Sequence, residues 1–226
     1  MIKSRTFLGL ILLHFVIFVC TTVKVQSQNT GNWLAYFGNQ PMGKRLTLWN
    51  EIQYRDYAIA GDFNQLLLRA GVGYNLTQNN NNILAGYAYI ITDRVIGDKK
   101  DITYENRLWQ QFFNRNVINR VILQHRYRTE QRFINDDFSF RFRYMMNVIV
   151  PLNQKSLIKS TWYTHVFNEL FINLDSPRFD RNRAYAGLGY VVDPTKRIEV
   201  GYLAQTLENS SRNQIQIYFF NTFRLY

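Results

Sequence analysis

Hydrophobic and polar side chains alternate along the chain between Phe138 and Val150. One parity carries Phe138, Phe140, Phe142, Tyr144, Met146 and Val148, and the other carries Ser139, Arg141, Arg143 and Asn147. Successive side chains of a β-strand point to opposite faces, so this segment predicts a strand with one aromatic and one cationic face. The pattern favours a strand that crosses a bilayer, with lipid outside and a polar lumen inside.

The same alternation recurs in runs of about ten residues, which is long enough for a tilted strand to cross a bilayer. Breaks containing Asn, Gly, Asp or Pro separate the runs. The expected strands span residues 46–55, 65–74, 83–91, 102–113, 117–131, 138–150, 157–167, 184–192, 198–206 and 214–226. Residues 33–37 are expected to form a short extra strand or a segment facing the lumen.

The fold class expected from these runs is all-β, a transmembrane antiparallel β-barrel of about ten strands. Twelve strands is the alternative, if two strands have been counted as one among these runs. Only a closed barrel satisfies every backbone polar group of such strands in lipid. The rival fold is a soluble β-sandwich, in which the aromatic faces would be buried against each other.

The breaks between the runs alternate in length. Compact turns are expected at residues 79–82, 114–116, 151–154 and 193–196, and longer connections at 58–62, 92–101, 133–137, 170–182 and 207–213. Outer-membrane barrels have short periplasmic turns and longer outer loops, so the compact set is expected to face the periplasm. The longest outer loop is then expected between Glu169 and Arg183.

Residues 1–27 have the features of a cleaved secretory signal peptide. Lys3 and Arg5 precede an apolar core over residues 7–19, and Ser27 supplies a small residue at the cleavage position. Because the apolar core is short for a membrane helix, we expect export and cleavage rather than a helical anchor.

Cleavage would leave residues 28–226 as a single barrel domain. It removes three cationic and no acidic residues, which lowers the formal net charge from +11 to +8. The one cysteine, Cys20, is also removed, so no disulfide is expected. A lipoprotein with lipid on Cys20 is the alternative, although Val19 stands where a small residue is usual.

Three later segments resemble a known family. They are Asn-Glu-Leu-Phe-Ile-Asn at 168–173, Phe-Asp-Arg-Asn-Arg at 179–183 and Ala-Gly-Leu-Gly-Tyr at 186–190. With Trp33, they make the chain similar to the Bacteroidota family of uncharacterised outer-membrane proteins named domain of unknown function 2490. The resemblance implies a barrel in the outer membrane of a Gram-negative cell. It carries over no catalytic or ligand residue, because the family defines none.

Charged residues are concentrated on the parity that is expected to face the lumen. The candidates for the lumen or an ion path are Arg55, Arg69, Arg107, Arg120, Arg126, Arg128, Arg141, Arg143, Glu51, Glu105 and Glu130. Arginine forks bind carboxylates in pairs of hydrogen bonds, which favours a narrow lumen largely filled by ion pairs and a structural or interaction role. Arginines outnumber carboxylates, so a narrow anion-favouring channel is the alternative.

The expected loop between Glu169 and Arg183 mixes acidic, basic and aromatic residues. Loops on a rigid scaffold often carry function, so Glu169, Asp180, Asn182 and Arg183 are outer-loop candidates for binding. The same residues would serve equally well to fold the loop over the barrel mouth.

Catalysis is not expected. A lipid hydrolase or acyltransferase would need a base within hydrogen-bond reach of a nucleophile. His125 and His165 have no serine two residues further along their own strands, and Ser139 and Ser160 could meet them only across the sheet. A lipid-modifying enzyme is therefore the least favoured of the three functions.

The remaining expectations concern partners. No Cys/His cluster or acidic loop has metal-ligand spacing, no glycine loop suits a phosphate-bearing cofactor, and no nucleic-acid partner is expected. The expected partners are outer-membrane lipid, small anions and the barrel-assembly machinery. The aromatic C-terminal residue Tyr226 resembles the signal for that machinery, although the apolar parity passes through Phe223 and Leu225.

Overall fold

A computed structural model of the chain describes residues 30–77, 80–96 and 99–223. The expected signal peptide, residues 1–27, and the C-terminal Tyr226 lie outside these residues. The described residues form eleven β-strands: β1 (Gly31–Met42), β2 (Leu46–Asp56), β3 (Phe63–Asn75), β4 (Asn81–Ile96), β5 (Lys99–Ile118), β6 (Val121–Ile134), β7 (Asp137–Pro151), β8 (Trp162–Asn173), β9 (Phe179–Asp193), β10 (Lys196–Leu207) and β11 (Ser211–Asn221). Among them no helix is long and apolar enough to span a membrane.

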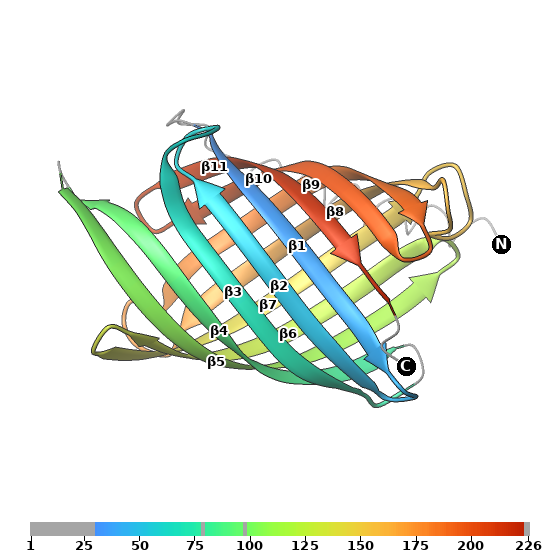
Figure 1. Ribbon diagram of the computed structural model, residues 1–226, viewed down its shortest axis with the longest axis horizontal. Coiled ribbons are helices and arrows are strands. Elements are labelled where there is room, and N and C mark those ends of the chain that lie inside the picture. Colours follow the sequence, from blue (N-terminus) through green and yellow to red (C-terminus); the bar gives the residue numbers. More distant parts are fainter. Residues whose placement is uncertain (1–29, 78–79, 97–98, 224–226) are drawn as a thin grey trace, which may run out of the picture.

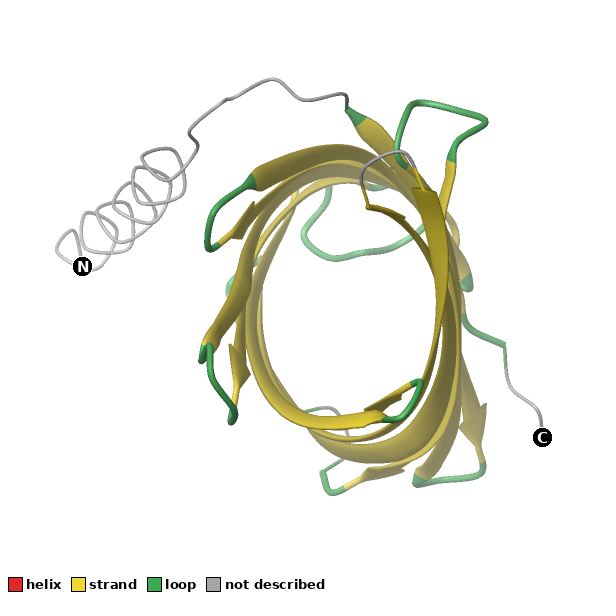
Figure 2. Ribbon diagram, turned by 90° about the vertical axis from the view of Figure 1, so that its left-hand side faces the viewer, coloured by secondary structure: helices red, strands yellow, loops and turns green. Residues whose placement is uncertain are grey.

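The strands close into one barrel, seen from the side in Figure 1 and end-on in Figure 2. Each strand pairs antiparallel with the next strand in sequence, and β1 closes the ring by pairing with β11. This closing pair is parallel and runs from Gly31 opposite Gln214 to Gly38 opposite Asn221. Closure gives every strand a neighbour on each side, so the sheet has no edge strand.

The expectation of ten strands, or twelve, is wrong for the described residues. Residues 33–37 form the middle of a full strand, β1, which pairs with β2 from Trp33 to Met42. An odd number of consecutively antiparallel strands can close only through a parallel pair. Parallel pairing also forms a hydrogen-bond ladder, here from Gly31 to Gly38 of β1, so an odd number of strands can still close into a ring.

Two expected boundaries are also wrong. Residues 114–116 lie inside β5, because Asn114 donates to Asn81 across the sheet at 2.8 Å and accepts from Asn116 at 2.6 Å. The turn comes later, at Asn119, whose φ of 57° is left-handed. Residues 157–161, expected to begin a strand, belong to the connection before β8.

The expected difference in loop length between the two barrel ends is not observed. The longest connection with described residues, 152–161, lies at the end expected to carry only compact turns. The segment from Glu169 to Arg183 is mostly strand, and only residues 174–178 connect β8 to β9. The polar residues of this segment interrupt the apolar alternation, because several of them face inward. In the sequence alone, such an interruption looks like a loop.

The outer face of the barrel is largely apolar and exposed. Outward-facing Ile52, Val72, Leu108, Val200 and Phe219 are each about half exposed. Several outward-facing polar side chains pair across neighbouring strands, as Gln110 does with Gln131 at 3.2 Å.

Two of these outer pairs involve polar residues that interrupt the apolar parity. The Tyr144 hydroxyl and His125 Nδ1 are 2.9 Å apart. Asn106 accepts a hydrogen bond from Tyr87. The polar side chains of Asn106 and His125 therefore have hydrogen-bond partners on the outer face itself.

Aromatic rings on the inner face pack over glycines of their own strand and of adjacent strands. The Tyr185 ring occupies the space where a Cβ of Gly187 or Gly201 would lie, and the Tyr163 ring does the same at Gly189. Tyr185 also stacks on Tyr218, with ring centroids 5.6 Å apart. These contacts pack the inner faces of β8, β9, β10 and β11, and across the ring the Trp109 ring packs in the same way over Gly71 and Gly86.

Candidate functional site

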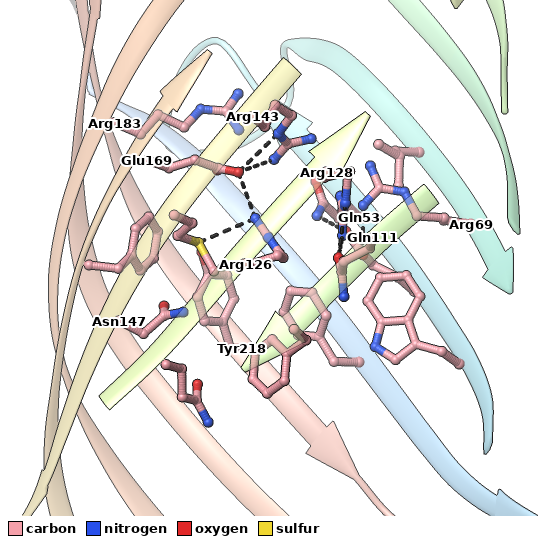
Figure 3. A pocket seen from close by; sticks show the side chains of 18 of the residues that line it. Gln53, Arg69, Gln111, Arg126, Arg128, Arg143, Asn147, Glu169, Arg183 and Tyr218 are labelled. Carbon is pink, nitrogen blue, oxygen red and sulfur yellow. Dashed lines mark hydrogen bonds and ion pairs between the residues drawn. The ribbon is translucent and has the colours of Figure 1, made fainter. Parts of the chain in front are cut away.

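The barrel encloses a cavity of about 950 Å³. Its lining reaches both ends of the strands: Tyr57 and Arg212 lie near one end, and Asn80 and Thr222 near the other. Side chains therefore fill only part of the lumen. Figure 3 shows part of the wall, with side chains of several neighbouring strands pointing toward one another.

Arginine is the commonest charged residue on this wall. Within the described part of the chain, thirteen arginines and four glutamates border the cavity. The arginines are Arg55, Arg69, Arg107, Arg115, Arg126, Arg128, Arg132, Arg141, Arg143, Arg181, Arg183, Arg197 and Arg212, and the glutamates are Glu51, Glu105, Glu169 and Glu199. The excess makes the cavity electropositive.

Glu130 of β6 connects many of these arginines from behind the wall, where it is fully buried. Its carboxylate accepts from Arg141 Nη2 and Arg143 Nη1, both at 2.6 Å. Arg107 Nη1 lies 3.4 Å and Arg128 Nη1 lies 3.8 Å from the same carboxylate. Four guanidinium groups around one carboxylate leave a local excess of positive charge.

A second carboxylate, Glu169 of β8, extends this network. It accepts from Arg126 Nη2 and Arg143 Nη2, each at 2.6 Å (Figure 3). Arg126 reaches past β7 to make this contact and also donates to Met145 Sδ at 3.2 Å. Arg143 therefore bridges Glu130 and Glu169.

Two further carboxylates complete the network. Glu105 Oε1 lies 2.7 Å from both Arg107 Nη2 and Arg132 Nε. Asp180 accepts from Arg141 Nη1 at 2.7 Å, from a bulge where β9 shifts register against β8. The network thus joins β5, β6, β7, β8 and β9, and fixes the inward arginines in one arrangement.

The arginines on β2 and β3 are neutralised less completely. Arg69 Nη1 lies 3.2 Å from Glu51 Oε2. Gln53 donates to Glu51 and accepts from Arg55, and the Arg55 guanidinium lies over Trp33 with 3.5 Å between its carbon and the ring centroid. Among the described residues, Arg55 is therefore linked to a carboxylate through the Gln53 amide and not directly.

Most of the sequence-predicted lumen residues lie together in the structure. Arg55, Arg69, Arg107, Arg126, Arg128, Arg141, Arg143, Glu51 and Glu105 line the cavity, and Glu130 lies behind it. Arg120 is the exception: it is exposed in the turn between β5 and β6, so its prediction as a lumen residue is wrong. The register places it one residue before β6, beyond the end of the inward face.

The four expected outer-loop residues lie in strands instead. Glu169 and Arg183 are buried on the inner wall, and Asp180 turns inward to Arg141. Asn182 faces outward, where it and Asn168 exchange amide hydrogen bonds of 2.9 and 3.0 Å. The loop assignment is wrong because the strands run several residues further than the apolar pattern indicates.

Five wall arginines were missed by the sequence analysis as lumen residues. They are Arg115, Arg132, Arg181, Arg197 and Arg212. Arg132 continues the parity of Arg126 and Arg128, and Arg212 continues that of Gln214. Extending the inward parity along these two strands would therefore have identified Arg132 and Arg212. Arg115 was missed because its segment was assigned to a turn.

The histidines have other partners than serine. His165 Nδ1 lies 2.7 Å from Glu199 Oε1, and its Nε2 lies 3.1 Å from Asn147 Oδ1. The hydroxyls of Tyr185 and Tyr163 donate to Glu199 at 2.7 and 3.1 Å. In the parts of the chain that are described, no three His, Cys, Asp or Glu residues gather in a way that could hold a metal ion.

Comparison with known proteins supports a family and assigns no activity. The family described as "Protein of unknown function (DUF2490)" matches residues 30–216. An uncharacterised protein of Methylorubrum extorquens is 29% identical over 167 residues, which cover 69% of each chain. No solved structure matches. Since the family match spans nearly the whole barrel, the chain belongs to the DUF2490 family of proteins of unknown function.

Proposed function

We propose that this protein is an outer-membrane β-barrel of a Gram-negative bacterium, whose lumen lets small anions pass. The observation that carries the proposal is the charge of the wall: thirteen arginines and four glutamates border a cavity of about 950 Å³ in the described residues. Rings of basic side chains favour anions in pores. The cavity also reaches residues at both ends of the strands.

The apolar outer face supports the membrane part of the proposal. Large hydrophobic side chains point outward on every side of the barrel and are substantially exposed. A closed barrel with this surface is suited to lipid because strand pairing around the whole ring satisfies backbone polar groups within the ladder. The signal peptide expected in residues 1–27 would direct export, and an origin in Bacteroidota remains part of the proposal.

On this proposal, lipid surrounds the barrel, the barrel-assembly machinery inserts it, and small anions are the solutes. We propose no nucleic-acid partner, no catalytic step and no cofactor for this protein. A structural or interaction role with a closed lumen is the second candidate. It is favoured by the buried network around Glu130, which neutralises part of the wall and fixes the side chains that border the cavity.

Single-channel recording tests the two candidates. The mature chain, folded in detergent, is placed in planar bilayers under a potassium chloride gradient, and the reversal potential reports the preferred ion. We expect discrete current steps with a reversal potential on the chloride side. Silence from protein shown to be folded would overturn the channel and favour the structural role, whereas a preference for potassium would overturn the proposed anion selectivity.

The best selectivity variant removes arginines that leave no carboxylate unpaired. Arg115 and Arg197 line the cavity, and no carboxylate of the described residues lies within 4.0 Å of either guanidinium. Arg126 and Arg141 are less suitable, because Glu169 and Glu130 would lose partners. Arg115→Gln with Arg197→Gln should lower the anion preference.

The matched control for that double variant is Arg45→Gln. Arg45 is exposed and donates to Tyr74 at 2.8 Å, away from the cavity. Like the double variant, the control removes positive charge, but from the exposed surface and not from the cavity. It should therefore leave the reversal potential unchanged. Equal shifts in the two variants would contradict a selectivity filter in the lumen.

A further inference from the structure

Two arginines of the lumen flank one indole ring. The Arg55 guanidinium carbon lies 3.5 Å from the centroid of the Trp33 ring, and that of Arg183 lies 5.0 Å from it. Arg55 comes from β2 and Arg183 from β9, on opposite sides of β1 in the ring of strands. All three side chains are buried, with exposed fractions of 9% or less.

The charges of these two arginines are not neutralised by direct partners. Within the described residues, no carboxylate oxygen lies within 4.0 Å of either guanidinium. Arg55 donates to Gln53, and Arg183 Nε donates to Gln205 Oε1 at 2.8 Å. By contrast, Arg143 contacts two carboxylates at 2.6 Å each.

Other cations increase the local positive charge. Arg183 and Arg212 both act on the charge of Arg55, as does Arg181, which is itself paired with Asp180 at 3.1 Å. Arg212 donates to Asn64 Oδ1 at 2.8 Å and to the Asp56 carbonyl at 2.7 Å. Several guanidinium groups therefore converge here although they repel one another, which a multivalent anion among them would offset.

Buried hydrogen-bond donors near this cluster lack acceptors. Among the described residues, four buried donor atoms here have no hydrogen-bond partner: Trp33 Nε1, Arg55 Nε, Gln214 Nε2 and Gln216 Nε2. Gln214 and Gln216 lie opposite Gly31 and Trp33 in the parallel pair of β11 with β1. Three of these donors, on Trp33, Arg55 and Gln214, belong to residues that border the cavity. Because nearly all buried polar groups are hydrogen-bonded in folded proteins, these unused donors require an explanation.

These features together fit a ligand that only accepts hydrogen bonds and carries more than one negative charge. A phosphate group has this chemistry, with a charge between about −1.5 and −2 at neutral pH and three acceptor oxygens. Guanidinium forks match phosphate oxygens in pairs, and chloride offers no such geometry.

We propose that Arg55, Arg183, Trp33 and Gln214 form a binding site for a phosphate group on the lumen wall. The site deepens the proposed anion pathway and rests on it, because it names the class of anion that the lumen would admit. Inorganic phosphate and a phosphate monoester share this chemistry, so both are used as probes. Arg212 lies at the adjacent strand end and would attract the anion toward the site.

Equilibrium dialysis against radiolabelled inorganic phosphate tests the site in the detergent-folded mature chain at constant ionic strength. We expect saturable uptake of one phosphate per barrel, against which equimolar chloride competes weakly. Arg55→Gln with Arg183→Gln should weaken binding by at least tenfold, and Arg45→Gln should leave it unchanged. Glycerol phosphate that displaces the label more strongly than phosphate would identify a monoester as the source.

Tryptophan fluorescence locates the bound anion. In a variant with Trp49, Trp109 and Trp162 changed to phenylalanine, Trp33 is the only tryptophan, and its emission should change with phosphate over the range seen in dialysis. If the double arginine variant does not fold, Arg183→Gln alone and Trp33→Phe serve instead. Each should weaken binding severalfold.

The outcomes separate this site from the proposed channel. Absence of saturable phosphate uptake by folded protein, or wild-type binding by the arginine variants, would overturn the site. The channel would still stand if the current remained anion-selective. Phosphate binding at Trp33 by a protein that conducts no ions would instead retain the site and overturn the channel.

Discussion

Arg143 and Glu130 are joined by a hydrogen bond of 2.6 Å between neighbouring strands β7 and β6. The exposed fraction of Glu130 is 0%, so its charge is offset only by the guanidinium groups around it. Removing one member of a buried ion pair leaves the others uncompensated, which costs far more than the loss of a surface pair. Glu130 is therefore the carboxylate on which the stability of the arginine wall depends most.

Glu130→Gln should lower the free energy of unfolding by about 3–5 kcal/mol, because Arg141 and Arg143 lose their shortest shared partner. Urea unfolding in detergent micelles measures the change. Glu208→Gln is the matched control, since Glu208 is exposed in the connection between β10 and β11. A loss no larger than that of the control would show that the network adds little to stability.

Gly201→Ala should destabilise the barrel by about 1–3 kcal/mol through overpacking. An added Cβ would fall within the Tyr185 ring, whose hydroxyl donates to Glu199 at 2.7 Å. Thermal unfolding followed by circular dichroism measures the loss. In a Tyr185→Leu background the same substitution should cost much less, and an equal cost in both backgrounds would contradict the ring-over-glycine packing.

The inward arginine face could be predicted from sequence because strand parity is a local property. Arg141 and Arg143 alternate with aromatic residues on their own strand, so one segment is enough to assign their face. Their partners depend on the register between strands. Arg126 reaches Glu169 past an intervening strand, and no local pattern indicates that contact.

The eleventh strand shows another limit of local pattern. Residues 33–37 have too short an apolar run to indicate a full strand, and an even strand count favoured leaving them out. Strand β1 is completed by its partners: it pairs with β2 on one side and β11 on the other. Closure of the ring is a global condition, so this part of the fold was not available from the residues of β1 alone.

Leu34→Cys with Ile217→Cys should form a disulfide, because these outward-facing residues lie opposite each other in the parallel pair of β1 and β11. Adjacent strands are about 4.8 Å apart, within the range that a disulfide spans. Residues 28–226 contain no other cysteine, so in a protein of these residues gel mobility without reductant reports the bond directly.

The control for this cross-link is Leu34→Cys with Ile198→Cys. Ile198 belongs to β10, which is separated from β1 by β11, so its cysteine should lie too far from residue 34 to react. Cross-linking of the control pair, or failure of the Leu34 and Ile217 positions to cross-link, would indicate a barrel that closes without β1.

Asn168 and Asn182 exchange two amide hydrogen bonds on the outer face of β8 and β9. If lipid surrounds this face, as proposed, an amide without its partner cannot turn to water. Asn168→Leu should then cost about 1–3 kcal/mol, because Asn182 keeps its polar group and loses its partner. Changing both residues to leucine removes the unpaired amide and should restore most of the loss. Unfolding in lipid vesicles measures both variants, and a double variant less stable than the single one would indicate that this face of the barrel is in contact with water.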